Sequence, residues 1–179
     1  MKPLYTKRYE PLVSLVIFFS VLCLCVLFYG KAYSQEAGKD KAVQLLKSAE
    51  GFYDEGDMEK ALSAVREAMS AMPGNAGAYD RLGYILLKKG QFDDALNAFN
   101  EALKINPNLR EAKTGTGLSL LGKGDLAGAE ATLTAALALN PYPSMTHYAL
   151  GLVYQKMNDD AKALSQFKEG LKTFKEGKK

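Results

Sequence analysis

Few side chains of this sequence have the types and spacing that acid–base, nucleophilic or metal chemistry requires. The chain has one histidine, His147, and an isolated histidine in a helical segment is more often a packed side chain than a general base. The two cysteines, Cys23 and Cys25, stand near the N-terminus, so the rest of the chain can form neither a disulfide nor a cysteine-based metal site. We therefore expect no catalytic residue, no bound metal and no cofactor.

One segment, Gly117-Leu-Ser-Leu-Leu-Gly122-Lys123-Gly124, comes close to the pattern of a phosphate-binding loop. Such a loop follows a strand, cradles phosphates with its backbone N–H groups and ends in a Ser or Thr that holds magnesium. Here Gly124 stands in place of that Ser or Thr, and the segment belongs to a predicted helix. We therefore expect no nucleotide site. The pairs Asp93-Asp94 and Asp159-Asp160 each open a predicted helix, where negative charge is favourable for structural reasons.

Most of the chain is electrically neutral. The sequence holds 23 lysines and arginines against 20 aspartates and glutamates, and the excess falls within residues 1–34. A body with balanced charge lacks the basic surface that binds a phosphate backbone. We therefore expect no nucleic-acid partner.

The first 34 residues have the three parts of an export signal. A basic start precedes an apolar run from Leu12 to Tyr29, and a polar segment follows. The small residues Ala32 and Ser34 have the spacing that a signal peptidase recognises, which predicts cleavage between Ser34 and Gln35. An uncleaved membrane anchor is the alternative, because this run of 18 residues just reaches the length of about 18–20 that spans a bilayer.

Either fate of the leader predicts the same location for the body. Positive residues before the apolar run favour an N-terminus that stays in the cytoplasm while the following chain is exported. The sequence has no Asn-x-Ser/Thr glycosylation site, which favours a bacterial envelope over a secretory lumen. We expect the body in the bacterial periplasm or on the periplasmic face of the inner membrane, with membrane contact only through the N-terminal segment.

A repeat of 34 residues organises the rest of the chain. Prolines mark its period, and two columns of small residues keep the same register: Pro73, Pro107 and Pro141; Ala49, Gly83, Gly117 and Gly151; Ala61, Ala95, Ala129 and Ala163. Antiparallel helices pack closely where side chains are small, and a Gly or Asn between them can reverse the chain. The pattern predicts helices near 41–54, 58–71, 76–89, 92–105, 110–123, 126–139, 144–157 and 160–174.

The second repeat of this sequence resembles the tetratricopeptide repeat, whose pattern is W-x2-L-G-x2-Y…A-x3-F…P. It carries the pattern as Tyr79, Leu82-Gly83, Leu86, Ala95, Phe99, Ala102 and Pro107. The fourth repeat is similar, whereas the first and third repeats depart more from this pattern. The resemblance implies an all-α fold, a right-handed α-solenoid of four helix-turn-helix hairpins. Its repeats would cover about 40–73, 74–107, 108–141 and 142–175, after a short linker at 35–40 and before a polar tail at 176–179.

Members of this family bind peptides in a concave groove that the first helix of each hairpin lines. The resemblance, carried over column by column, places nine candidate residues there: Leu46, Tyr53, Tyr84, Leu87, Lys88, Leu118, Leu121, Tyr148 and Leu152. Their apolar and aromatic character favours an apolar helix or extended segment as the ligand. The alternative for several of the leucines is packing against a neighbouring hairpin. Relatives that clamp a chaperone's terminal carboxylate use Lys and Asn at groove columns where this chain has Glu50 and Asp80, which disfavours that role.

The resemblance implies a non-enzymatic scaffold or adaptor that binds another protein or peptide segment of the cell envelope. Self-association is the alternative, because stacked repeats without a capping helix can associate end to end. The last predicted helix must then cap itself, and Lys162, Lys168 and Lys172 predict a polar outer face for it.

Three glycines in one predicted helix of the third repeat, Gly115, Gly117 and Gly122, each cost about 1 kcal/mol relative to alanine. We therefore expect the third repeat to be the soft part of the solenoid.

Overall fold

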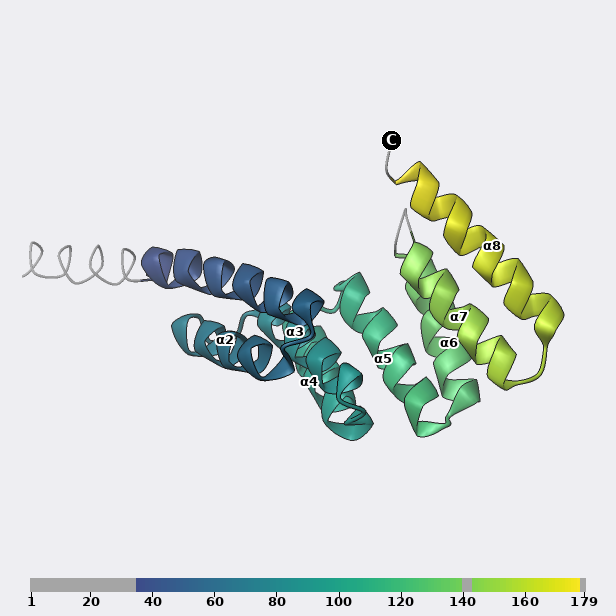
Figure 1. Cartoon of the computed structure of the whole chain (residues 1–179), viewed down its shortest axis with the longest axis horizontal. Helices are drawn as coiled ribbons and strands as arrows, with labels where there is room; N and C mark the ends of the chain where they lie inside the picture. Colours follow the sequence, from purple (N-terminus) through teal and green to yellow (C-terminus); the bar gives the residue numbers. More distant parts are fainter. Residues whose placement is uncertain (1–34, 140–142, 178–179) are drawn as a thin grey trace, which may run out of the picture. The chain divides into compact units, whose positions relative to one another are not determined.

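The computed structural model describes residues 35–139 and 143–177. These residues form helices and turns, with no strand among them (Figure 1). The chain divides into two compact units, residues 1–41 and residues 42–179. Within the described ranges, no helix combines the length and the apolar character needed to cross a membrane. The predicted leader, including Ser34 at the predicted cleavage point, lies outside the described residues.

The second unit is a succession of helical hairpins. Its helices cover 42–55, then α2 Met58–Ala71, α3 Ala76–Lys88, α4 Phe92–Ile105, α5 Arg110–Lys123, α6 Leu126–Leu137, α7 Ser144–Lys156 and α8 Asp160–Glu176. The predicted bounds of α2 to α8 agree with these to within two residues at each end. Residues 35–40, predicted as a short linker, are helical, since glutamine, glutamate, alanine and lysine there favour a helix.

Each hairpin reverses at a residue with a left-handed backbone. Gly56, Gly90 and Gly124 have φ angles of 84°, 74° and 84°, and Asn158 takes the same role at 60°. Glycine adopts this conformation without steric cost, and asparagine tolerates it better than most residues. An aspartate then begins the next helix in three of these turns, as where the Asp125 side chain accepts a hydrogen bond from the Gly128 N–H. The predicted turn chemistry is therefore confirmed.

Small residues set the spacing between helices. Consecutive helices pack from α2 to α8, and the first helices of neighbouring hairpins also touch, α3 with α5 and α5 with α7. The alanine column is buried, with exposed fractions of 0% at Ala61, Ala95 and Ala129 and 4% at Ala163. A Cβ placed on Gly83 would lie 2.5 Å from the Phe99 ring, so this helix pair requires a glycine.

The same packing explains two of the glycines in α5. A Cβ on Gly117 would lie 2.5 Å from Leu133, and one on Gly115 would overlap the Phe99 ring. These glycines therefore lower the helix propensity of α5 but allow it to lie close to α4 and α6. An alanine at either position would be destabilising, because the neighbouring side chain would have to move. The predicted softness of the third repeat stays a prediction.

Helix α8 carries exposed apolar side chains as well as the predicted polar ones. Leu164, Leu171 and Phe174 have exposed fractions of 55%, 57% and 50%. The predicted lysines are also exposed.

Candidate functional site

The first helices of the hairpins enclose a cavity on their shared inner side. Its volume is about 310 Å³, and it is called the inner cavity below. The helix at 42–55 contributes Ala49, Glu50, Tyr53 and Asp54; α3 contributes Arg81, Tyr84 and Ile85; α5 and α7 contribute Glu111 and Met145. The cavity therefore joins all four hairpins of the second unit.

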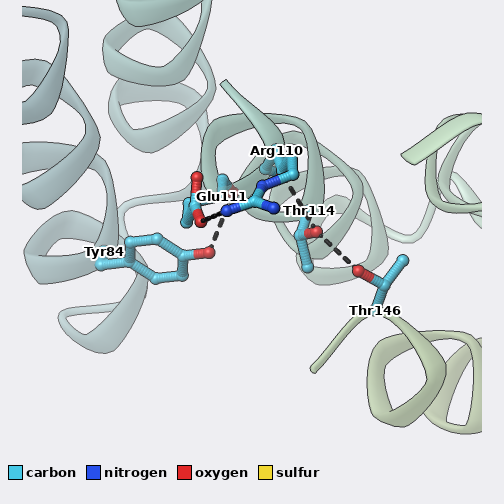
Figure 2. Close-up of polar contacts among 5 residues, drawn as sticks. All are labelled: Tyr84, Arg110, Glu111, Thr114 and Thr146. Carbon is cyan, nitrogen blue, oxygen red and sulfur yellow. Dashed lines mark hydrogen bonds and ion pairs between the residues drawn. The ribbon is translucent and has the colours of Figure 1, made fainter. Parts of the chain in front are cut away.

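Tyr84 forms the best-fixed wall of the inner cavity. Its ring meets the Phe99 ring edge-on, with centroids 5.1 Å apart. Its hydroxyl donates a hydrogen bond of 2.9 Å to the Glu111 carbonyl oxygen, which ties α3 to the start of α5 (Figure 2). Burial raises the pKa of the Tyr84 phenol, and the charges of Asp80 and Glu111 raise it further. The phenol is therefore a neutral donor at physiological pH.

Tyr53 is a second aromatic wall, and it already contacts a cation. The Lys88 Nζ atom lies 5.0 Å from the centroid of its ring, within the range of a cation–π interaction. Burial raises the pKa of the Tyr53 phenol, and the nearby Asp54 carboxylate adds to that shift. The ring thus presents a π-face near negative charge.

Ion pairs at the rim of the inner cavity are long and exposed. Glu50 Oε1 lies 3.4 Å from Arg81 Nη2, and this pair links the helix at 42–55 to α3. Glu111 Oε1 lies 3.5 Å from Arg110 Nη2, as Figure 2 also shows. Exposed pairs of this kind contribute about 0–1 kcal/mol each, so they leave their carboxylates able to bind another cation.

Asp80 is the most unusual residue near the inner cavity. Its exposed fraction is 5%, and its Oδ1 atom is buried with no hydrogen-bond partner among the described residues. Burial raises the pKa of this carboxyl to about 7; the Arg81 charge opposes the shift and the Glu111 charge adds to it. A buried acceptor without a donor is costly. The stability of the folded chain alone therefore does not explain an aspartate at position 80.

A pair of threonines holds the next two first helices together. The Thr114 and Thr146 hydroxyl oxygens lie 2.9 Å apart in the buried space between α5 and α7 (Figure 2). Thr114 also lies within hydrogen-bonding distance of the Arg110 carbonyl oxygen, at 3.2 Å. These contacts fix α7, and with it Met145, relative to the rest of the inner face.

The nine predicted groove residues fall in different surroundings. Tyr53 and Tyr84 line the inner cavity. Leu46, Leu87, Leu118 and Leu121 are partly buried against the hydrophobic clusters of the core. Lys88 is exposed above the Tyr53 ring, Leu152 is half-buried, and Tyr148 lines a different cavity. Their role in binding a ligand stays a prediction.

The inner cavity also contains residues that the column assignment missed. Arg81 and Ile85 line this cavity, but each lies one position past a residue that the resemblance placed in the groove, Asp80 and Tyr84 respectively. The nine chosen residues also omitted every acidic residue of the lining. The sequence signal was present, because Glu50, Asp54 and Glu111 occupy first helices at positions that face inward.

A second cavity of about 570 Å³ lies between α7 and α8. Its walls include Met145, Tyr148, Phe167 and Leu171, and it is called the C-terminal cavity below. The Phe167 ring lies 5.7 Å from the Tyr148 ring. No group of three or more metal-binding side chains occurs in the part of the chain that the structure describes.

Comparisons with known proteins agree with the fold of helical hairpins. The family model of the tetratricopeptide repeat matches residues 46–110 and 81–144, together more than half of the chain. The sequence has no significant match among curated proteins.

Several solved structures share the fold. MamA from Desulfovibrio magneticus RS-1 is 22% identical with a TM-score of 0.61, and the match covers 77% of this chain and 78% of that one. The tetratricopeptide repeat protein TTC0263 from Thermus thermophilus is 23% identical with a TM-score of 0.69 and coverage of 74% of each chain. The first repeat domain of Spaghetti (RPAP3), bound to the HSP90 peptide SRMEEVD, is 19% identical with a TM-score of 0.60 and coverage of 67% and 95%.

Proposed function

The chain belongs to the tetratricopeptide repeat family, and on that premise we propose that it is a scaffold of the cell envelope that holds a peptide segment of another protein in its inner cavity. Proteins of this family generally mediate protein–protein interactions and are not enzymes, and the Spaghetti domain is bound to a peptide. The observation that carries the proposal is the inner cavity itself. It is open, concave and lined from four successive hairpins, as a site for an extended segment must be.

The apolar lining supports an apolar or aromatic anchor on the ligand. Ala49, Ile85 and Met145 contribute apolar surface, and the rings of Tyr53 and Tyr84 add flat walls. Met145 has an exposed fraction of 56%, so its flexible side chain is free to adapt to a partner. A ligand side chain that fills this space would displace water from these groups.

The envelope location of this scaffold rests on the predicted leader. An apolar run after a basic start directs export, and the same reasoning places the repeats outside the cytoplasm. Mass spectrometry of the N-terminus in isolated cell fractions tests this part separately. A chain that begins at Gln35 in the periplasmic fraction would agree with cleavage, an intact chain in the inner membrane would agree with an anchor, and an intact chain in the cytosol would contradict export.

Selection from a random 12-residue peptide library tests the binding function. The full chain is immobilised in a non-ionic detergent, and selected peptides are measured by fluorescence anisotropy. The Met145→Lys and Tyr84→Lys variants are expected to bind at least about tenfold more weakly, since a charged ammonium group would occupy the apolar wall. Leu164→Lys is the matched control, because Leu164 is equally exposed at 55% but lies outside the inner cavity.

Circular dichroism checks that the variants remain folded. Met145 is mostly exposed, so its substitution is expected to leave the helical spectrum and the melting temperature unchanged. Peptides that bind Met145→Lys and the wild type equally well would refute the inner cavity as the binding site.

Self-association is a second candidate function, because apolar residues gather at the C-terminal end. Tyr148, Leu171 and Phe174 each have exposed fractions of at least 50% and line the C-terminal cavity. Sedimentation equilibrium of the full chain tests the idea, with Leu171→Glu as the variant. An oligomer that Leu171→Glu dissociates would support it, and a monomer mass at all concentrations would rule it out.

A further inference from the structure

The lining of the inner cavity has more negative than positive charge. Three carboxylates, Glu50, Asp54 and Glu111, face one guanidinium, that of Arg81. Glu50 and Glu111 are about half exposed, and their ion pairs with Arg81 and Arg110 are no shorter than 3.4 Å. Since neither pair is buried or short, a second cation can approach these carboxylates without first breaking a strong interaction.

Asp80 adds an unsatisfied acceptor to the same inner face. It lies one helical turn before Tyr84 in α3, so both side chains project from the same side of the helix. The residues that act on its charge, Arg81 and Glu111, both line the cavity. Its Oδ1 atom is buried and accepts no hydrogen bond within the described residues. Asp80 is buried and is not part of the lining, so it can act on a ligand only through its charge.

The walls suit the alkyl stem of a long basic side chain. Ile85 and Met145 supply apolar contact, while Tyr53 and Tyr84 offer aromatic faces. The Lys88 ammonium group already lies over the Tyr53 ring, so the carboxylates of the rim, rather than this ring, supply the attraction for a second cation. Apolar walls with carboxylates at the rim are complementary to a side chain that is apolar along its stem and cationic at its end.

We infer that the inner cavity binds a lysine or arginine side chain of the partner's peptide segment. The stem lies against the apolar walls, and the cationic head lies among the three carboxylates of the rim. The inference rests on the proposed function, because it names the chemistry of the segment that the groove holds. Charge complementarity favours this occupant over an acidic one, since the lining holds three carboxylates and one guanidinium.

A charge series of peptides tests the inference. One peptide selected from the random library is synthesised with its basic residue intact, with norleucine in its place and with glutamate in its place. Affinity for the full chain is expected to fall about tenfold with norleucine and further with glutamate. Binding of the original peptide should also weaken as salt is raised, because rim carboxylates are screened.

Paired variants locate the charges that act. Glu50→Gln with Glu111→Gln is expected to remove most of the difference between the basic and norleucine peptides. Glu101→Gln with Glu169→Gln is the matched control, expected to leave the difference unchanged. Those glutamates are also ion-paired and about half exposed, but they lie outside the inner cavity: the four exposed fractions are 53%, 49%, 48% and 48%.

The outcomes separate this inference from the proposed function. Peptides that depend on Met145 yet bind equally well with norleucine would overturn the cation preference and leave the scaffold function standing. Selection of peptides that contain neither lysine nor arginine would overturn it too. If the library yields no peptide that depends on Met145 or Tyr84, both the inference and the proposed function fail.

Discussion

Replacement of Asp80 by asparagine is expected to make the protein more stable at neutral and alkaline pH. Burial raises the pKa of Asp80 from 3.8 to about 7 in the folded state. A shift of one unit corresponds to about 1.36 kcal/mol, so a gap of about three units sets an upper limit of roughly 4 kcal/mol. This is the free energy that the folded chain loses when it must hold the carboxylate charged.

The sign follows from which state holds the proton. Between about pH 4 and pH 7 the folded state keeps Asp80 protonated while the unfolded state has released that proton. Stability from this group is therefore greatest below pH 4, falls as pH rises to about 7 and is constant above it. Asp57 and Asp159 have lowered pKa values because hydrogen bonds from Lys60 and Lys162 favour their charged forms, so they titrate below this window.

Urea denaturation followed by circular dichroism at pH 5, 6, 7 and 8.5 measures the effect. The difference in unfolding free energy between Asp80→Asn and the wild type should grow with pH and level off above 7. The asparagine is also buried, so the change of the difference with pH is the informative quantity. Glu67→Gln, at an exposed position, is the control and should show no such change. A constant difference between pH 5 and pH 8.5 would refute the reasoning.

Three further experiments test the packing and capping of the hairpins by the same denaturation assay. Gly83→Ala should destabilise the protein by about 1–3 kcal/mol because its Cβ has no room, whereas Gly51→Ala, with open space around it, should stabilise by about 0.5–1 kcal/mol; equal effects would contradict the close approach of α3 and α4. A double-mutant cycle of Thr114→Val and Thr146→Val should give a coupling energy of about 0.5–1.5 kcal/mol, and zero coupling would exclude the hydrogen bond. Asp125→Ala should cost about 1 kcal/mol by removing the N-cap of α6, and an unchanged stability would argue against that cap.

The hairpins could be predicted because a few small residues leave one way to pack. A glycine opposite a large ring, as at Gly83 and Phe99, admits close contact only when both helices are present and antiparallel. Glycines with positive φ then fix the turns. Since these residues recur every 34 positions, one readable repeat predicts the others, including the poorly matching third.

The groove was harder to predict because adjacent helix positions point about 100° apart. Leu118 and Leu121 share a face with groove columns, but they pack with the cluster around Leu133 and Leu150. Arg81 and Ile85 instead reach the inner cavity from one position further along. Which residues remain accessible depends on the crossing of neighbouring hairpins, and the columns of one repeat do not determine that crossing.

The carboxylates of the inner cavity change the chemistry expected of the ligand. Their effect is larger than that of any single residue omitted from the predicted groove. A choice of groove residues by apolar and aromatic character includes Tyr53 and Tyr84, which line the inner cavity, but omits the carboxylates beside them. Those carboxylates come from separate helices, so no local motif reveals that Glu50 and Glu111 share one space. Once the fold brings them together, an apolar anchor alone would leave them only their long ion pairs with Arg81 and Arg110. A segment that combines an apolar stem with a cationic end satisfies both parts of the lining.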